Sequence, residues 1–476
     1  MKITILILTF LTFIVNSNCQ IVMDKKANII DSLLNSCNDN GIFNGVALVA
    51  DEGKIILQKS YGTSDIKSHS QLKLTDRFYI GSLTKQFTSV LILQLQEDEL
   101  IDINSPISTY LTEFRDSIWE KVTVHQLLTH TSGFGSYTFH SSFDKSIIYT
   151  DQEMFEFIKQ PLLFEPGTDW SYSNSGYFLL GKIAERLTNK NYGTLLNEKI
   201  FSPLKMNNSS FSTEWLNHRI AKGYKRTIDG IKPMPAYSLV TLFSTGGIYS
   251  SVGDLFIWSQ ALDGNKLLSD KSKDILFQPI QNDYACGIYV KKGIDENGNK
   301  FERHFHGGMI QGYHSFMLKR VPQKQVVILL DNFYNQEIQT IKNRIWSTLV
   351  NEDIRNIKSK LSNILYSACA ENTLIDLLDS ISNNQVQFEN QFELEEFDIN
   401  TVGYRLMEAK RYTEATALFN FNIMLYPYSW NVYDSIGELF LKQGEFIDAE
   451  NYYKKSLLLN PKNSSAEIAL KKIKQH

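Results

Sequence analysis

A serine followed three residues later by a lysine can supply a nucleophile and its base, and the chain contains five such pairs. They begin at Ser64, Ser70, Ser82, Ser142 and Ser202. Only Ser82 follows a short strand-like segment and opens a long apolar run with helical spacing. At a helix N-terminus, free backbone N–H groups and the helix dipole stabilise developing negative charge. Lys85 would lie on the same helix face. Taken alone, this spacing is more often a capping serine beside a solvated lysine.

Two further segments carry groups that could complete such a site. Tyr172-Ser173-Asn174 occurs once in the chain. A tyrosine hydroxyl near a lysine can move protons between a nucleophile and a leaving group, and an asparagine amide can orient a substrate carbonyl or amide. The simpler interpretation of Tyr172 and Asn174 is a loop with a packed tyrosine.

The second segment is His306-Gly307-Gly308, which follows a strand-like run. Glycines there would let a substrate backbone approach the strand edge. The N–H of Met309 could pair with the N–H of Ser82 as an oxyanion hole. The histidine would either carry positive charge or donate a hydrogen bond. The alternative is a β-bulge with a half-buried histidine.

The segments around these motifs predict the elements that position them. Residues 45–50 and 55–58 read as two strands of a hairpin, and residues 301–331 return to strands. Residues 82–95 and 338–350 read as helices, and short helices fill residues 105–240. Strands from both ends with helices between them predict an α+β fold, in which helices flank an antiparallel sheet and an all-helical subdomain is inserted.

In this order, the three motifs resemble those of the serine penicillin-recognising family, which includes class C β-lactamases, D-alanyl-D-alanine carboxypeptidases and related esterases. Residues 127–133 (Leu-Leu-Thr-His-Thr-Ser-Gly) resemble a helix-to-loop signature of that family, and residues 245–255 resemble another. The likeness spans residues 24–350. It implies a β-lactamase/transpeptidase-like fold and a structural role for His130. We expect no cofactor, and no metal either, because no third ligand stands at a useful spacing from His304 and His306.

The resemblance also implies roles for the site residues. Ser82 would form an acyl-enzyme, Lys85 would take its proton, and Tyr172 would relay a proton to the leaving group. The substrate would be held by the remaining residues of the motifs, namely Asn174, Gly307, Gly308 and Met309. His306 belongs to the predicted catalytic set and stands where the family has Lys or His, usually near the substrate carboxylate. Here His replaces Lys, and Gly307 replaces the usual Thr. Both departures reduce the positive charge and hydroxyl donors available to a carboxylate. A carboxypeptidase or esterase is therefore favoured over an efficient β-lactamase.

The C-terminal residues contain an internal repeat with a period of 34. Gly403 and Gly437 are one period apart, and so are three other pairs: Ala415 and Ala449, Phe419 and Tyr453, and Pro427 and Pro461. This pattern resembles the tetratricopeptide repeat, in which small residues let two helices pack closely. We expect a helical connector at residues 351–395 and a repeat module at residues 396–476, which could bind a protein partner.

The first residues and the overall charge indicate where the protein is located and which partners it lacks. Residues 1–19 have the charged, apolar and polar regions of a signal peptide, which predicts an exported protein that is periplasmic or secreted. A lipid anchor on Cys19 is the less favoured alternative, because Asn18 precedes it. The net charge of −4 gives no basic field for nucleic acid. The other three cysteines show no disulfide framework.

These observations predict an exported serine hydrolase that acts through an acyl-enzyme. Its substrates would be small molecules or peptides with an amide or ester bond, including D-amino-acid peptides, esters and β-lactam-like compounds. Two alternatives remain open. The domain could be a non-catalytic, penicillin-binding-like sensor, or the main role could belong to the repeats as an adaptor.

Overall fold

The computed structural model describes residues 25–115, 118–211, 220–234, 239–294, 298, 300–334, 338–350 and 359–475. The predicted signal peptide at 1–19 lies outside these residues. Within them, no helix is both long and apolar enough to cross a membrane. The chain divides into two compact units: Met1–Lys225 with Pro233–Arg355, and Arg226–Lys232 with Asn356–His476.

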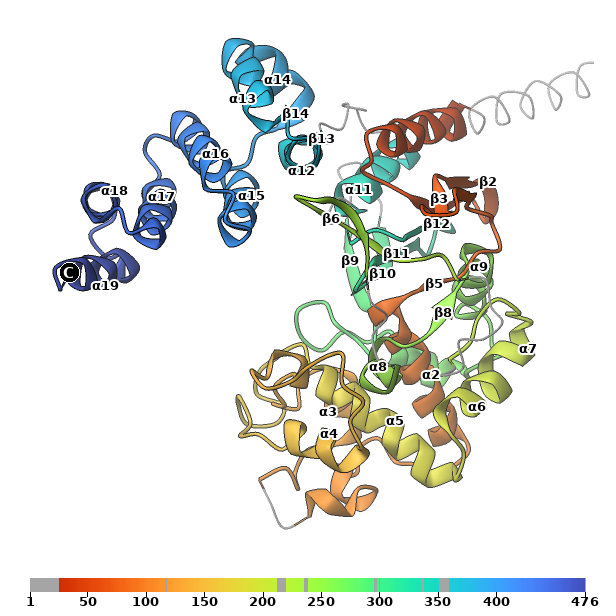
Figure 1. Ribbon diagram of the computed structural model, residues 1–476. Coiled ribbons are helices and arrows are strands. Elements are labelled where there is room, and N and C mark those ends of the chain that lie inside the picture. The colour runs from red at the N-terminus through yellow and green to blue at the C-terminus, as the bar shows by residue number, and fades with distance from the viewer. Residues whose placement is uncertain are drawn as a thin grey trace, which may run out of the picture. The chain divides into compact units, whose positions relative to one another are not determined.

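The first unit is built on a six-stranded antiparallel sheet with the order β2-β1-β12-β11-β10-β9 (Figure 1). Strand β1 pairs with β12, and Gly45 lies opposite Asp331, so segments far apart in sequence lie side by side. This confirms the predicted sheet, although β9 was not predicted. The strands are β1 (Gly45–Asp51), β2 (Lys54–Tyr61), β9 (Tyr289–Ile294), β10 (Lys300–Ile310), β11 (Tyr313–Arg320) and β12 (Gln325–Asp331).

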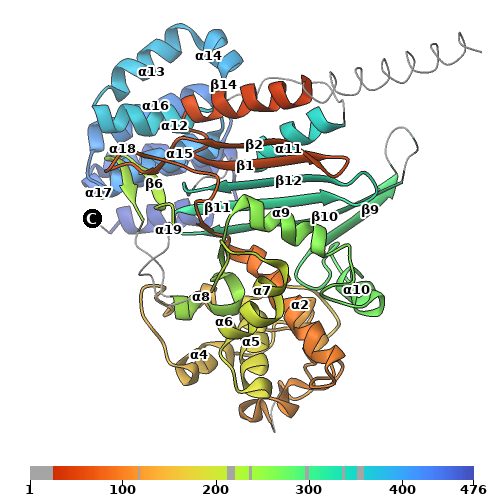
Figure 2. The same ribbon diagram turned by 90° about the vertical axis from the view of Figure 1, so that its right-hand side faces the viewer.

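Helices cover both faces of this sheet (Figure 2). The helix at residues 25–39 and α11 (Ile338–Leu349) lie on one face, and α9 (Val252–Ala261) lies on the other with the inserted helical region. Every residue of β1 and β12 is buried as a result. Their near-continuous apolar sequences follow from this burial, because a strand covered on both faces needs no polar side.

The inserted helical region surrounds α2 (Thr84–Glu97), of which eleven residues are buried. The sequence predicted one apolar face, but α2 is covered on nearly all sides because α5 and α8 pack on it. A short pair of strands, β5 (Phe78–Tyr79) and β8 (Tyr249–Ser250), fixes the chain just before α2. The other helices here are α3 (Val124–Leu128), α4 (Asp151–Ile158), α5 (Asn174–Thr188), α6 (Tyr192–Leu196), α7 (Ser202–Leu204), α8 (Leu239–Gly246) and α10 (Asp270–Leu276).

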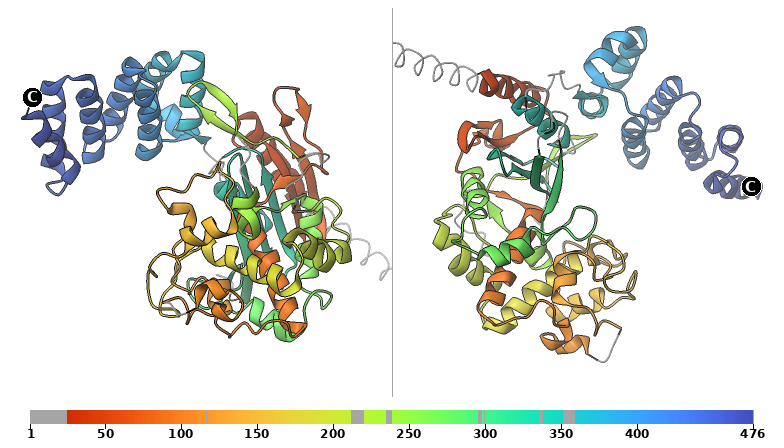
Figure 3. Two further views of the ribbon diagram at one scale, coloured as in Figure 1. Left: turned by 60° about the horizontal axis from the view of Figure 1, so that its bottom comes forward. Right: turned by 180° about the vertical axis from the view of Figure 1, so that it is seen from behind.

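The second unit is a run of paired helices (Figure 3). It contains α12 (Leu361–Glu371), α13 (Leu374–Asn383), α14 (Gln385–Gln391), α15 (Glu396–Glu408), α16 (Tyr412–Leu425), α17 (Trp430–Gln443), α18 (Phe446–Leu459) and α19 (Ser464–Ile473). Gly403 packs against the Phe419 ring, and one period later Gly437 packs against the Tyr453 ring. The region predicted as a connector joins this unit, since α12 packs on α15 and α13 packs on α16.

Candidate active site

Ser82 lies in a 3-10 turn, η1 (Gly81–Leu83), between β5 and α2. Gly81 has φ +52°, and a Cβ on it would lie 2.9 Å from the Met309 backbone nitrogen. Only glycine allows β10 to approach the turn this closely in this conformation. Ser82 is half-buried and lines a pocket of about 420 Å³. Its hydroxyl therefore stands between the start of a buried helix and the edge of a strand.

The fully buried Lys85 reaches back to this serine. Its Nζ lies 3.2 Å from Ser82 Oγ, 2.8 Å from Asn174 Oδ1 and 2.8 Å from the Thr245 carbonyl oxygen. Burial holds the pKa of Lys85 well below its usual value, because a low-dielectric environment disfavours the charged form. A neutral amine has two N–H groups and one lone pair. In that form, with the N–H groups donated to Asn174 and Thr245, the lone pair would face Ser82 Oγ.

Both of these acceptors are supplied by helix ends. Thr245 lies near the end of α8, after a kink at Phe243 (φ 32°), and carbonyl groups at a helix end have no partner within the helix. Asn174 is the first residue of α5, which Ser173 caps by accepting from the Gly176 N–H. The Asn174 amide also donates through Nδ2 to Thr138 Oγ1 at 3.2 Å. Both ends of the amide are thus held, and its orientation is fixed.

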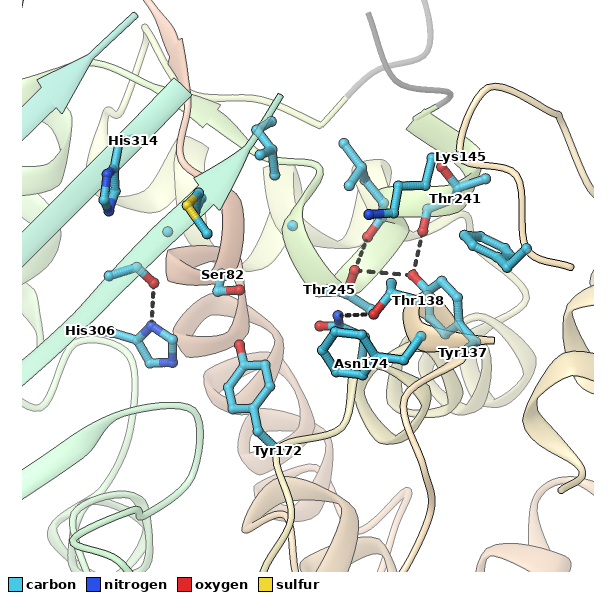
Figure 4. A pocket seen from close by; sticks show the side chains of 18 of the residues that line it. Ser82, Tyr137, Thr138, Lys145, Tyr172, Asn174, Thr241, Thr245, His306 and His314 are labelled. Carbon is cyan, nitrogen blue, oxygen red and sulfur yellow. Dashed lines mark hydrogen bonds between the residues drawn. The ribbon is translucent and has the colours of Figure 1, made fainter. Parts of the chain in front are cut away.

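The Tyr172 side chain points toward Ser82 (Figure 4). Its hydroxyl is buried and, within the described residues, has no partner at ordinary hydrogen-bond distance. Burial raises its pKa above the usual value, and the nearby Ser82 hydroxyl offsets part of this effect. The Lys85 Nζ lies 5.0 Å from the centre of the tyrosine ring. Tyr172 is therefore a protonated phenol beside both the nucleophile and the lysine.

The His130 ring packs against the Tyr172 ring. Its ring centre is 4.4 Å from that of Tyr172, and its Nδ1 accepts from the Ser173 N–H at 3.2 Å. Burial, with a smaller effect from Lys85, holds the pKa of His130 well below its usual value. His130 is thus a neutral ring that packs against Tyr172 and fixes the backbone that follows it.

The edge of β10 forms the opposite wall of the site. Strand β9 pairs with β10 only as far as Phe305, so the next residues of β10 face the pocket. A Cβ on Gly308 would lie 1.9 Å from the Ile80 carbonyl oxygen, so glycine is required there. The position of the Met309 nitrogen beside Gly81 suits an N–H donor directed at a substrate oxygen.

His306 is buried and neutral in this wall. Burial is the main cause that lowers its pKa to about 3. Its Nδ1 lies 2.6 Å from the Gly307 carbonyl oxygen, which makes Nδ1 the donor, and its Nε2 lies 3.4 Å from the Tyr284 hydroxyl. Of the two states considered from the sequence, the geometry supports the neutral hydrogen-bonding ring.

Comparison with known proteins identifies the family. The beta-lactamase family model matches residues 29–330. The chain belongs to the beta-lactamase family.

Curated relatives in the beta-lactamase family include a penicillin-binding protein of Bacillus subtilis (strain 168), which is 28% identical over 333 residues, 65% of this chain and 72% of that protein. The teichoic acid D-alanine hydrolase of Staphylococcus aureus (strain MRSA252) is 29% identical over 289 residues, 59% of this chain and 70% of that protein. The D-amino acid amidase of Ochrobactrum anthropi SV3 shares the fold, with a TM-score of 0.60 and 21% identity over 69% of this chain and 99% of that one.

Membership of the beta-lactamase family makes the first unit a serine hydrolase domain.

The structure also brings residues to the pocket that the sequence did not reveal. Tyr137 donates to the Thr241 carbonyl oxygen at the pocket wall, and Lys145 and Thr138 line the same space (Figure 4). They come from the loop between α3 and α4 and from the start of α8. No local pattern marks loop residues that reach a pocket only through tertiary structure.

Proposed function

We propose that the protein is an exported hydrolase that cleaves amide or ester bonds through an acyl-enzyme on Ser82. The observation that carries this proposal is the buried Lys85 amine, whose pKa burial holds well below its usual value, 3.2 Å from Ser82 Oγ and with its other contacts taken by two acceptors. A positioned base of depressed pKa is what a serine needs in order to act as a nucleophile near neutral pH.

The reaction can be written with these groups. The Ser82 proton passes to Lys85 Nζ while Oγ bonds the substrate carbonyl carbon, and the resulting oxyanion meets the N–H groups of Ser82 and Met309. When the amide or ester bond breaks, the leaving group takes the Tyr172 proton, and the Lys85 ammonium returns one to Tyr172. Water then attacks the acyl-enzyme carbonyl carbon while its proton passes to Lys85 Nζ. When the bond between Ser82 Oγ and the acyl group breaks, Lys85 returns that proton to Oγ.

Substrates with a D-amino acid are favoured over β-lactams. Because His306 is neutral and Gly307 has no hydroxyl, this wall offers less to a β-lactam carboxylate than a Lys-Thr pair would. Two of the similar proteins are described as acting on D-alanine or D-amino acid amides. We therefore propose a D-amino-acid peptidase, amidase or esterase.

The first test is the intact mass of the purified protein after incubation with a fluorophosphonate and, separately, with a penicillin. We expect one covalent adduct on Ser82, no adduct in Ser82→Ala, and normal labelling in Ser202→Ala. Ser202 is a matched control, because it has the same spacing to a lysine and is exposed. No adduct with either reagent would refute the proposal and favour a non-catalytic protein. A stable penicillin adduct without turnover of D-alanyl substrates would favour a sensor.

We also propose that α15–α18 are two tetratricopeptide repeats with α19 as a capping helix, and that they bind a protein partner. The equivalent packing of Gly403 on Phe419 and Gly437 on Tyr453 supports this assignment. The period of 34 residues and the paired helices fit the same architecture.

A further inference from the structure

A single lysine stands over the pocket outside the proposed catalytic set. Lys145 lies in the loop between η4 (Tyr137–Phe139) and α4, and its exposed side chain lines the pocket. Figure 4 shows its ammonium extending from the loop over the pocket. Within the described part of the chain, no carboxylate pairs with it. The adjacent Asp144 instead accepts from the backbone N–H and the hydroxyl of Ser146, at 2.8 and 2.7 Å.

The formal charge of the pocket lining is positive. Among the described residues that line it, Lys145 is the only Lys or Arg, and none is Asp or Glu. Two histidines, His306 and His314, also line the pocket. The ring nitrogens of His306 contact the Gly307 carbonyl oxygen and the Tyr284 hydroxyl, and burial lowers its pKa to about 3. An unpaired ammonium beside a pocket without carboxylates attracts anionic ligands.

The position of Lys145 indicates which part of a substrate it meets. Figure 4 places Tyr172 on one side of Ser82, and Lys145 with Thr241 on another. In the proposed reaction Tyr172 protonates the leaving group, so the leaving group lies on the tyrosine side. The acyl group then extends away from Tyr172, along Asn174 and toward Lys145.

We propose that Lys145 is a specificity-determining residue that selects substrates whose acyl group carries a carboxylate. This inference rests on the proposed serine hydrolase function and adds a substrate class to it. A lysine acts as a single mobile point charge, which balances one carboxylate. The described lining holds no second Lys or Arg to balance a doubly charged phosphate or phosphonate.

The test compares three 4-nitrophenyl esters of similar acyl length: butyryl, succinyl and 3-phosphonopropionyl. We expect the full-length wild-type protein to favour the succinyl ester over the butyryl ester in kcat/KM. The ratio should fall about tenfold in Lys145→Met, the scale of one hydrogen bond to a charged group, and should be retained within about twofold in Lys145→Arg. The ratio should also decrease in about 1 M salt, because salt screens an exposed charge.

Lys121→Met is the matched control. Lys121 is exposed and does not line the pocket, and its substitution removes the same charge as Lys145→Met. It should leave the ratio unchanged. An equal ratio in wild type and Lys145→Met would overturn the inference while leaving Ser82 catalysis intact. A preference for the phosphonopropionyl ester would overturn the assignment to carboxylates. Failure of all three esters together with failure of Ser82 labelling would refute the proposed function itself.

Discussion

In the proposed reaction, the proton of Ser82 leaves only while Lys85 is neutral. Burial keeps the folded-state pKa of Lys85 well below the ordinary 10.5. The charged form dominates below that lowered pKa, so the active form is lost as pH falls through it and is already present well below pH 10.5. The carbonyl oxygen of Thr245 and the amide oxygen of Asn174 also orient the amine. In the neutral amine, these two contacts direct the lone pair toward Ser82.

We expect Lys85→Met to reduce the rate of fluorophosphonate labelling of Ser82 by about a hundredfold or more, the usual contribution of a general base. In the wild type, the labelling rate should rise with pH and level off well below 10.5, and the variant should lack this transition. Lys67→Met is a matched control, because Lys67 follows Ser64 at the same spacing but is exposed. A pH profile shared by wild type and Lys85→Met would rule out this role for the lysine.

At the level of elements, the sequence predicted what local patterns encode. Strand-like apolar runs marked β1 and β10–β12, helical spacing marked α2, and the family motifs marked Ser82 and Tyr172. The residues that were not predicted depend on tertiary approach. Lys145 enters the pocket from an irregular loop, and Thr245 acts through a backbone carbonyl, for which side-chain type carries no signal. The protonation of His306 was also undetermined, because it depends on burial.

The close approach of β10 to η1 gives a prediction at this scale. In Gly308→Ala the new Cβ would meet the Ile80 carbonyl oxygen at 1.9 Å, so the strand must move away from Ser82. We expect a loss of about 1–3 kcal/mol in unfolding free energy and slower Ser82 labelling, measured by denaturant melts and mass spectrometry. The neighbouring Gly307→Ala should keep its stability, because the nearest atom to its Cβ is 3.6 Å away. Equal stability losses in the two variants would contradict this account of the strand edge.

At the scale of the whole molecule, the second unit is more than the repeats. Its core contains Leu365 and Leu378 from α12 and α13 together with Leu406 and Phe419 from α15 and α16. It also contains Ile228, from the hairpin of β6 (Tyr224–Thr227) and β7 (Gly230–Pro233), whose carbonyl oxygen accepts from Arg411 at 3.3 Å. The chain therefore enters this unit twice, and the helices before and after residue 395 share one core.

This shared core predicts different behaviour for two truncated proteins. A chain ending at residue 395 keeps α12 and α13 but loses the helices that bury their apolar faces, so it should self-associate and melt at a lower temperature than a chain ending at 355. Ile228 loses its contact with Arg411 in both proteins, and only the longer protein keeps residues 361–391. Light scattering and thermal melts measure the difference, and Ser82 labelling reports whether the first unit stays folded. If the protein ending at residue 395 were monomeric and as stable as the one ending at 355, α12–α14 would fold without the repeats. The single core inferred for the second unit would then be wrong.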